Sequence, residues 1–415
     1  MGIVIKKLYE TVEECRVCHS ANIQEVLNLG KQPPANSLYS LDDDHPEDVP
    51  LRLVYCQKCS TVQLGEDVNP GYLFRNYLWI TGTSIVAEQY SYKFVKKALS
   101  ELIDSNIKKP YVIEIASNDG TFLKRFIESG CKVLGVDPAK NIAELAVENG
   151  IPTRNDFFTI ELAKNLLKEN GKSDIIFARN VIPHVKEIHS VISGMSTLLK
   201  ENGVGIIEFH NAGLVLEEMH YDYIYHEHLF YYTLKTIGGL INRHGLYIYD
   251  VMKSPISGGS WVVYFSKEKK EKSEKLIDLE QYELDNKINS YNRWQSFSEK
   301  VMQHSSKLRE MVINEDKKIL AYGASARSST LLNFCRITSE HISSVLDKNP
   351  LKKGLITAGS NIPIISFEDG LKEIKDAEKI LLLAWNFQDE IIKDLRDSGF
   401  KGKFIIPLPG NPYIL

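Results

Sequence analysis

The chain of 415 residues lacks several features that mark common classes of protein. It has no basic excess: 50 Lys and Arg stand against 54 Asp and Glu, which leaves little positive charge to neutralise phosphates. No apolar stretch approaches the length of a membrane span. The start, 1–7, lacks the apolar core of a signal peptide and the hydroxyl residue of a myristoylation site. These absences predict a cytoplasmic protein that binds neither nucleic acid nor membrane.

Cysteine is scarce, and its distribution is informative. Four of the six cysteines form two Cys-x-x-Cys pairs, and 37 residues separate Cys18 from Cys56. In a reducing compartment such pairs bind metal more often than they form disulfides, and two tight turns complete a tetrahedron of thiolates. We expect a structural zinc site whose ligands are Cys15, Cys18, Cys56 and Cys59.

Other interpretations of the cysteines stay open. The stretch 15–19 also matches the haem-attachment pattern, although haem attachment needs an export route that this sequence does not supply. The four thiols can also be unliganded. Cys131 and Cys335 stand alone inside apolar runs, and we expect them to fill the core.

Strand-like and helix-like segments alternate over most of the chain, which predicts an α/β protein with mostly parallel sheets covered by helices. Pro255 and two glycines form a short turn between the last two predicted strands of the first sheet, 246–252 and 261–265, so an antiparallel hairpin is expected at its edge. The predicted strands are 111–115, 132–136, 173–178, 204–209, 246–252, 261–265, 319–324, 343–346, 379–384 and 404–408.

Composition divides the chain into four regions. Residues 1–75 are rich in loop formers, and so short a unit needs a metal to hold it together. Residues 76–267 form a central α/β unit, and the charged stretch 268–312 predicts one or two solvated linking helices. Residues 313–415 form a second, Rossmann-like unit.

The turn after the first central strand, Glu114-Ile-Ala-Ser-Asn-Asp-Gly120, lacks the G-x-G-x-x-G pattern of dinucleotide sites. Its small residues and the following helix start allow close approach of a ligand, and Asp137 ends the second strand where a ribose is bound. Acidic side chains repel a pyrophosphate but suit an ammonium and a sulfonium, so we expect S-adenosylmethionine rather than NAD. A merely structural turn is the alternative. The predicted cofactor residues are Glu114, Ala116, Asn118, Asp119, Gly120, Asp137, Pro138, Asn155, Asp156 and Asn180.

The segment 220–232, His220-Tyr-Asp-Tyr-Ile-Tyr-His-Glu-His-Leu-Phe-Tyr-Tyr232, combines aromatic rings, three histidines and two carboxylates. In an α/β methyltransferase it would face the acceptor substrate and supply proton transfer and hydrogen bonds. A second metal at the His-x-His pair and satisfied core histidines are the alternatives. His184, after the fourth strand, is either a pocket wall or a proton shuttle. The candidates within the segment are Tyr225, His226, Glu227 and His228.

Taken in order, these motifs resemble those of the nucleotide-sugar C-methyltransferases, S-adenosylmethionine-dependent enzymes that add a methyl branch to C-3 of a 4-keto deoxysugar. The likeness covers essentially the whole chain. It rests on the two cysteine pairs, 114–120, 135–139, 222–228, 258–260, 322–327, 330–333, 347–354 and 384–386.

The resemblance implies a zinc-binding domain, a class I methyltransferase fold, a C-terminal Rossmann-like domain that helps to bind the nucleotide sugar, and a monomer. Trp79, where a tyrosine is expected, and Glu208, in place of an apolar strand ending, depart from the family pattern. The resemblance assigns catalytic positions to Tyr77, His184, Tyr225, Glu227 and His228.

In the C-terminal unit, 323–327 follows a strand and opens a helix whose N–H groups can hold a diphosphate. The alternative is a Rossmann-like fold used only as a scaffold. The predicted substrate residues are Tyr225, Ser325, Ala326, Arg327 and Asp347.

We expect His228 to act as the base, Tyr225 as an alternative base or enolate donor, and Glu227 to orient its neighbours. An O- or N-methyltransferase is the main rival within enzymes. A non-catalytic zinc-containing scaffold protein is the rival from another class.

Overall fold

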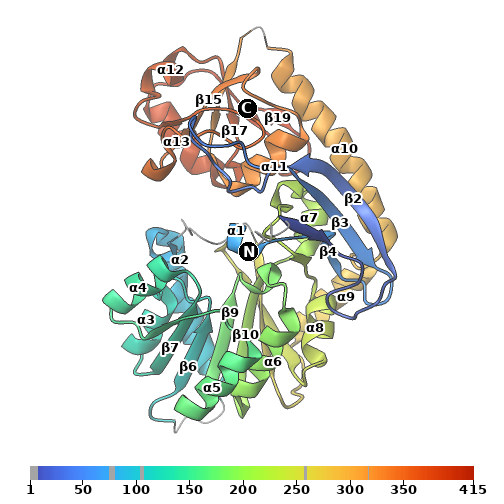
Figure 1. Cartoon of the computed structure of the whole chain (residues 1–415), viewed down its shortest axis with the longest axis vertical. Coiled ribbons are helices and arrows are strands. Elements are labelled where there is room, and N and C mark those ends of the chain that lie inside the picture. The colour runs from blue at the N-terminus through green and yellow to red at the C-terminus, as the bar shows by residue number, and fades with distance from the viewer. Residues whose placement is uncertain (1–7, 74–79, 103–106, 257–258, 316) are drawn as a thin grey trace, which may run out of the picture.

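The computed structural model describes residues 8–73, 80–102, 107–256, 259–315 and 317–415. Tyr77 and Trp79, both singled out from the sequence, lie outside the described residues. The central and C-terminal α/β units lie at opposite ends of the molecule, and the N-terminal sheet and helix α10 (Tyr291–Ile313) join them along one side (Figure 1). The predicted α/β class is confirmed.

The central unit is a seven-stranded sheet in the order β12-β13-β10-β9-β6-β7-β8. The strands from β8 to β10 run parallel, and β13 is antiparallel to both of its neighbours, as the short connecting turn predicted. Every strand predicted here is present. The bounds are β6 (Tyr111–Ile115), β7 (Lys132–Asp137), β8 (Thr153–Asn155), β9 (Ser173–Arg179), β10 (Leu199–His210), β12 (Tyr247–Ser254) and β13 (Ser260–Ser266).

Helices cover both faces of this sheet. Aromatic side chains of α2 and α3 pack on one face, whereas aliphatic side chains of α5, α6 and α8 pack on the other. Because both faces are covered, β6 is buried along its whole length, which explains its continuous apolar character. The helices are α2 (Ile85–Ser100), α3 (Thr121–Glu128), α4 (Lys140–Glu148), α5 (Ile160–Asn170), α6 (Ile188–Leu198), α7 (Ala212–Glu217) and α8 (Leu234–Asn242).

The C-terminal unit repeats this arrangement on a smaller scale. Its sheet has the order β16-β15-β14-β17-β18-β19, in which only β19 pairs antiparallel. Its elements are β14 (Ile319–Tyr322), α11 (Ala326–Phe334), β15 (Ile342–Asp347), β16 (Ile364–Ser366), α12 (Leu371–Asp376), β17 (Lys379–Leu382), α13 (Gln388–Asp397), β18 (Lys403–Ile406) and β19 (Tyr413–Ile414).

The N-terminal unit contains more regular structure than its loop-rich sequence predicted. Strands β2 (Ile23–Gln32), β3 (Val49–Cys56) and β4 (Val62–Leu64) form a sheet whose fourth strand, β11 (Phe230–Tyr231), comes from the central region. The N-terminal sheet is therefore completed by a segment that directly follows the predicted catalytic residues. Short strands β1 (Tyr9–Thr11) and β5 (Glu66–Val68) pair beside it, before α1 (Pro70–Leu73).

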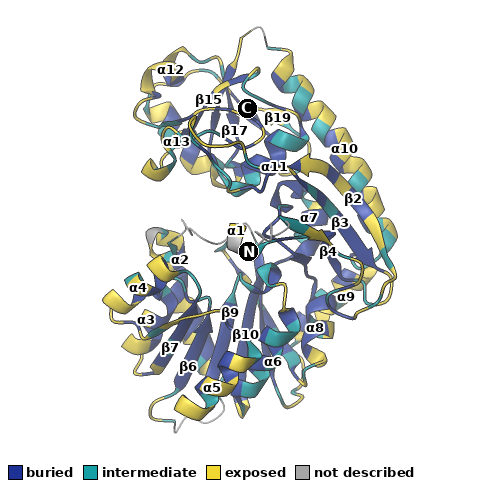
Figure 2. Ribbon diagram, viewed as in Figure 1, coloured by how far each residue is buried: buried dark blue, intermediate teal, exposed yellow. Residues whose placement is uncertain are grey.

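The charged linker forms two helices, α9 (Glu274–Asp285) and α10, as predicted, but α10 is not simply solvated. It buries Trp294, Phe297, Val301 and Leu308 along one side. Figure 2 shows this buried side facing the N-terminal sheet and the exposed side facing outward. The prediction of a solvated helix was wrong because its many charges hide an apolar stripe with helical spacing.

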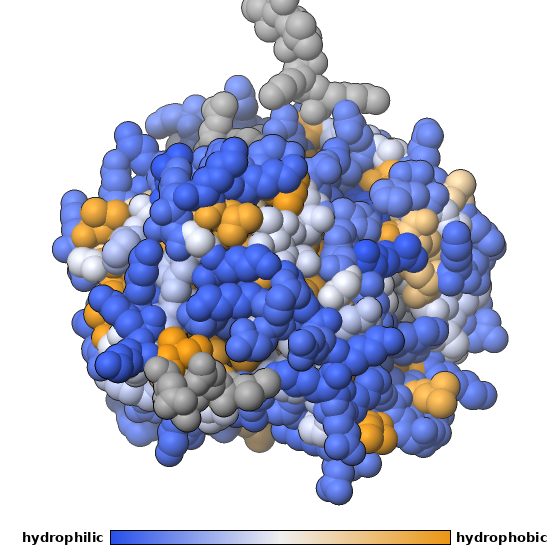
Figure 3. All heavy atoms as spheres, turned by 90° about the horizontal axis from the view of Figure 1, so that it is seen from below, coloured by the Kyte–Doolittle hydropathy of each residue, from blue (hydrophilic) through white to orange (hydrophobic). Residues whose placement is uncertain are grey.

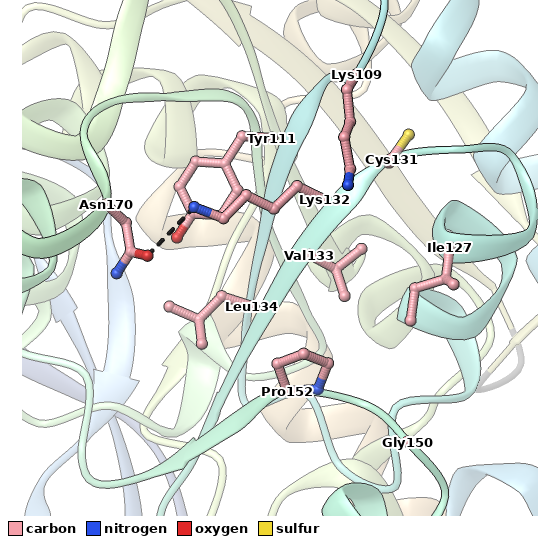
Figure 4. Close-up of a pocket in the computed structure, with 10 residues that line it drawn as sticks. All are labelled: Lys109, Tyr111, Ile127, Cys131, Lys132, Val133, Leu134, Gly150, Pro152 and Asn170. Carbon is pink, nitrogen blue, oxygen red and sulfur yellow. Dashed lines mark hydrogen bonds between the residues drawn. The ribbon is translucent and has the colours of Figure 1, made fainter.

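Among the described residues, no helix is long and apolar enough to cross a bilayer. The face turned away from the C-terminal unit is mostly hydrophilic with scattered apolar spots (Figure 3). An open pocket of about 360 Å³ lies between the starts of β6 and β7 and includes Tyr111, Lys132 and Cys131 (Figure 4). It lies at the amino ends of the strands, whereas ligands of open α/β sheets bind at the carboxyl ends. Cys131 and Cys335 are buried, as predicted.

Candidate active site and metal centre

The four paired cysteines meet at one point, as their spacing predicted. Their sulfur atoms all lie within 4.8 Å of one another, with 3.6 Å between Cys15 and Cys59 and 3.4 Å between Cys18 and Cys56. Tetrahedral thiolates around zinc lie about 3.8 Å apart, so these distances fit that ion. Among the described residues no other group of His, Cys, Asp or Glu is placed to share a metal. The second metal considered for the His-x-His pair is therefore not supported.

Both Cys-x-x-Cys turns have the same backbone geometry. His19 and Ser60, which follow the pairs, have φ of 56° and 65°, and their N–H groups donate to the carbonyls of Cys15 and Cys56. The Cys15 thiol donates to the Cys59 sulfur, which raises the pKa of Cys15 far above its usual range and lowers that of Cys59 to about 4. Four sulfurs this close can all be thiolates only when a divalent cation balances their charge. The cluster fits zinc.

The turn after β6 has three residues with positive φ and is fixed by a hydrogen bond to Asp137. Ala116, Asn118 and Gly120 have φ of 53°, 51° and 77°, and a Cβ on Gly120 would meet Ile151 at 2.8 Å. Asp137 accepts the N–H of Asn118 at 2.9 Å, which fixes the turn against the end of β7. The backbone thus forms a cradle at the carboxyl ends of β6 and β7.

Several predicted cofactor residues use their polar groups in hydrogen bonds within the protein, and these bonds shape the cradle. Asn118 Oδ1 and Asp119 Oδ2 each accept a backbone N–H from the segment 81–82, at 2.9 Å in both cases. Asn155 Nδ2 and the Asp156 N–H both donate to the carbonyl of Asp137. Pro138 lies in the bend between Asp137 and α4, where the Ala139 N–H donates to the Asp137 carboxylate.

Three buried side-chain oxygens in this region lack a hydrogen-bond partner among the described residues. Ser117 Oγ lies against Gly135 of β7, and the other two are Glu114 Oε2, near the end of β6, and Asn180 Oδ1, directly after the neighbouring β9. A buried acceptor without a donor is costly, so it indicates a ligand that donates. An ammonium group supplies such donors, as the acidic sequence of the turn predicted.

The electrostatics of the cradle favour a cation. Burial raises the pKa of Glu114 well above its usual range, Arg179 opposes this rise, and the nearby charges of Asp119 and Asp137 add to it. Arg179 is itself engaged, because its Nε donates to Glu208 at 2.8 Å. This ion pair explains the unexpected Glu208 at the end of β10: the carboxylate is fully buried but paired.

Four of the five predicted catalytic residues converge beside the cradle. The ring of His228 lies 3.8 Å from that of Tyr225 and 4.8 Å from that of His184, centroid to centroid. His184 Nδ1 donates to the Glu227 carbonyl at 2.8 Å. His184 follows Asn180 by four residues, so the short helix at 182–184 connects the cradle to the cluster.

Hydrogen bonds fix the tautomers of both imidazoles. His228 Nδ1 lies 2.7 Å from the Tyr223 carbonyl, which can only accept, so Nδ1 carries the proton. Burial, together with His184, lowers the pKa of His228 well below its usual range, and burial lowers that of His184 to about 4. Both rings are therefore neutral near pH 7, and His228 presents an unprotonated Nε2.

His226 does not belong to the cluster. Its Nε2 donates to the backbone carbonyls of Val49 and Pro50 in the N-terminal unit, at 3.2 and 3.3 Å. It is a buried histidine that ties the segment to β3. The satisfied core histidine weighed from the sequence describes its Nε2, whereas its buried Nδ1 has no hydrogen-bond partner among the described residues.

Asn36 is a site residue that sequence reasoning missed. Its Nδ2 donates to Glu227 Oε1 at 2.5 Å, across 191 positions of the chain. Burial raises the pKa of Glu227 to about 7, and the hydrogen bond from Asn36 lowers it. Asn36 lies among prolines in a segment assigned only to loop, and no local pattern distinguishes its side chain from any other in that segment.

The C-terminal unit holds the start of the catalytic segment. Arg327 donates to both oxygens of Asp222, at 3.0 and 2.9 Å, and Trp385 Nε1 donates to the same carboxylate at 2.8 Å. The Thr330 hydroxyl donates to the Ile224 carbonyl. Arg327, predicted to bind substrate, thus uses two of its donors to join the two α/β units.

The second cradle is built like the first. Asp347 accepts the N–H of Ala324 at 2.9 Å and that of Asn349 at 2.8 Å. Ser325 caps α11 by accepting the Ser328 N–H, and Ala326 is the first helical residue. Lys352, which the sequence prediction missed, donates to the Ala324 carbonyl and lies 3.3 Å from Asp347.

Three family models match consecutive parts of this chain. They are "Putative zinc binding domain" over residues 15–74, "Methyltransferase domain" over 86–251 and "C-methyltransferase C-terminal domain" over 255–409. The chain is 30% identical over 417 residues to the C-methyltransferase NovU of Streptomyces niveus, covering 98% of this chain and 97% of that protein. It is 26% identical over 111 residues to a ubiquinone biosynthesis O-methyltransferase of Pelagibacter ubique (strain HTCC1062), covering 27% and 46%.

Among solved structures, magnesium protoporphyrin IX methyltransferase (ChlM) from Synechocystis PCC 6803 with bound SAM is 14% identical, with a TM-score of 0.36. The match covers 48% of this chain and 98% of that one. The strand order and the methyltransferase domain match give the central unit the class I methyltransferase fold. S-adenosylmethionine and a structural zinc are the cofactors that this fold and the four-cysteine cluster indicate. The chain belongs to the C-methyltransferase family.

Proposed function

We propose that this enzyme methylates C-3 of a nucleotide-bound 4-keto-deoxysugar through an enolate. The observation that supports the proposal is the cluster formed by His184, Tyr225, Glu227 and His228, which the short helix at 182–184 joins to Asn180 at the end of β9. The similarity to NovU over nearly the whole chain supports a carbon acceptor. The 4-keto sugar itself rests on the family resemblance.

Carbon methylation requires removal of a C–H proton, and the side chains must make this possible. The pKa of a C-3 proton next to a ketone is roughly ten units higher than that of imidazole, which corresponds to a free-energy difference of about 14 kcal/mol. Donors aimed at the enolate oxygen must supply much of this difference. We assign the proton transfer to His228 Nε2 and the donor role to the hydroxyl of Tyr225.

Neutral His228 is ready to accept a proton but is a weak base, because burial and the adjacent His184 lower its pKa. The negative charge of an enolate and a diphosphate beside it would raise that pKa when substrate binds. Glu227, with a pKa near 7, has the greater proton affinity in the free enzyme. We therefore keep Glu227 as the orienting group and as the alternative proton acceptor.

S-adenosylmethionine bound in the cradle supplies an electrophilic methyl group. Glu114 and Asn180 would hold its ammonium, and Asp137 its ribose, in agreement with the unpartnered oxygens of the first two. We also propose that Phe157, a 58% exposed ring directly after Asp156, covers one face of the adenine. We also propose that the functional divisions of the chain fall at 75/76, 267/268 and 312/313.

In the C-terminal unit, we propose that Ser325, Ala326, Arg327 and Asp347 help to bind the nucleotide diphosphate, with Lys352 added to the set. A pocket of about 410 Å³ opens beside them, between residues 385–390 and Pro409. Its place after β17 is at the carboxyl ends of the sheet, where open α/β sheets bind ligands.

The decisive experiment is incubation with labelled cofactor and a panel of 4-keto nucleotide sugars in deuterium oxide. Deuterium incorporation at C-3 of the recovered substrate and label on C-3 of the product are expected, because the transferred methyl group replaces the C-3 hydrogen. His228→Asn and Tyr225→Phe, made singly and together, should lower turnover without weakening S-adenosylhomocysteine binding. Near-full activity of the double variant would refute the assignment, and label on oxygen or nitrogen without exchange at C-3 would refute carbon methylation.

A further inference from the structure

The segment that follows β2 leaves the N-terminal sheet and reaches both α/β units. Ala35 is buried, and Tyr39 pairs through its backbone with Ile356 of the C-terminal unit, at 3.2 and 2.8 Å. The Tyr39 hydroxyl donates to Asn361 at 2.8 Å. One end of the segment is fixed in the N-terminal sheet and the other on the C-terminal unit, so the residues between them have a defined position.

Asn36 lies in the middle of this segment and reaches the catalytic cluster. Asn36 itself is exposed, but its amide nitrogen donates to a carboxylate whose residue, Glu227, is only 7% exposed. The backbone of Glu227 is held from the opposite side by His184. Oε1 of Glu227 is thus engaged by Asn36, and among the described residues no hydrogen bond to Oε2 is found.

We propose that Asn36 is a positioning residue of the methyl transfer: its amide fixes the ionised Glu227 carboxylate, and through it the zinc-bearing N-terminal unit sets the geometry of the active site. This inference rests on the proposed function, which places Glu227 beside the acceptor. An amide nitrogen only donates, so it stabilises the ionised carboxylate over the protonated acid.

The surroundings of Glu227 leave this role to Asn36. The titratable residues within two positions of Glu227 are Tyr225, His226 and His228, and His184 contacts its carbonyl; burial lowers the pKa of each of these histidines. Neutral imidazoles offer no positive charge to Glu227. The side-chain hydrogen bond from Asn36 is the interaction that lowers the pKa of this buried carboxyl.

The test uses Asn36→Leu, which keeps the size of the side chain and removes the donor, and Asn36→Asp, which adds a second carboxylate. Asn28→Leu is the control, because Asn28 lies in β2, where its Oδ1 accepts the Gly30 N–H and its Nδ2 donates to the exposed carboxylate of Glu25, outside the active site. The acidic limb of the rate profile should move up by about one pH unit in Asn36→Leu and further in Asn36→Asp. Turnover at pH 7 should fall about fivefold in Asn36→Leu and recover near pH 9.

A second readout does not depend on turnover. A carboxyl whose pKa is raised by folding stabilises the fold while it is protonated, and this contribution is lost as pH rises from the unfolded value of ~4.3 through the folded value. In Asn36→Leu the pKa of Glu227 in the folded protein rises further, so the loss of folding stability continues to a higher pH. Thermal melts of the variant and the parent should therefore agree at pH 5 and diverge at pH 8.5, whereas Asn28→Leu shows the same small difference at both.

An equal loss of melting temperature at both pH values, with an unmoved rate profile, would show that Asn36 is only structural and overturn the inference. If no 4-keto sugar is methylated but the melts diverge with pH, the proposed function fails and the coupling of Asn36 to Glu227 stands. Unchanged melting temperatures together with a shifted rate profile still support a positioning role for Asn36, because the substitution then affects the reaction without affecting folding stability.

Discussion

The two α/β units place an aspartate at the same point and use it in the same way. Asp137 accepts the N–H groups of Asn118 and Ala139, and Asp347 accepts those of Ala324 and Asn349. In each unit the carboxylate ends the second strand and closes the turn that follows the first. The backbone of the cradle is therefore shared.

The side chains around the two aspartates differ in charge. Asn118 and Ala324 are equivalent, because each donates its N–H to the aspartate of its unit. With these two aligned, Asp119 of the first unit corresponds to Ser325 of the second, and Thr121 corresponds to Arg327. Lys352 also lies beside the second aspartate. The comparison teaches that the fold provides a place for a ligand, and that a few side chains decide whether a cation or an anion is preferred.

Removal of the zinc should have the largest effect, because it should abolish turnover while the central unit still binds its cofactor. The N-terminal sheet contacts the catalytic segment through the pairing of β4 with β11 and the bonds of His226 to β3, whereas the first cradle is built within the central unit. Structural zinc contributes on the order of 10 kcal/mol to the folding of small domains. A strong chelator should abolish turnover but leave S-adenosylhomocysteine binding, measured by calorimetry, within a few fold. Loss of both together would show that the central unit is not independent.

Replacement of either aspartate by alanine should give the next largest difference between the two units. Asp137→Ala removes a carboxylate that accepts two backbone N–H groups, so affinity for S-adenosylhomocysteine should fall about 100-fold or more. Asp347→Ala is the matched control, and it should leave that affinity unchanged while raising KM for the nucleotide sugar. Calorimetry and steady-state kinetics distinguish these effects, and circular dichroism confirms that both variants fold.

A smaller effect is expected when the positive charge of the second cradle is reduced. Lys352→Gln leaves Asp347 without its cation, so a diphosphate would meet an uncompensated carboxylate. KM for the nucleotide sugar should rise about tenfold, with the cofactor affinity unaffected. The exposed Lys353, which pairs only with Asp369, provides the control in Lys353→Gln. An unchanged KM would indicate that the second unit serves only as a scaffold.

The smallest effect is a pH dependence confined to the first cradle. Burial raises the pKa of Glu114 in the free enzyme, and a bound ammonium would lower it again, so binding releases a proton wherever the free carboxyl is protonated. Affinity for S-adenosylhomocysteine should therefore rise with pH, by a few fold per unit and at most tenfold, until the pKa of the free enzyme is passed. Glu114→Gln should abolish this slope. Titrations at pH 6, 7 and 8 provide the measurement, and a slope that persists in the variant would exclude Glu114 as its source.

The success of the sequence prediction differed between regions for a physical reason. The strand at 111–115 was predicted correctly because a parallel strand covered on both faces is apolar throughout. Strand β2 was missed because exposed and buried residues mix along it, and its pairing with β3 shifts register twice. The buried side of α10 was missed because it is formed by contact with a sheet that had not been predicted.

The sequence alone determined the features whose residues are close in the chain or carry specific chemistry. The Cys-x-x-Cys turns, the acidic turn after β6 and the aspartate at the end of β7 are local, because ligand geometry and backbone hydrogen bonds span only a few residues. Tertiary structure alone decided which side chains meet across the units. Asn36 with Glu227 and Asp222 with Arg327 are 191 and 105 positions apart, and such pairs depend on how three packed units settle against one another. Packing of that kind is a property of whole surfaces, so no short motif encodes it.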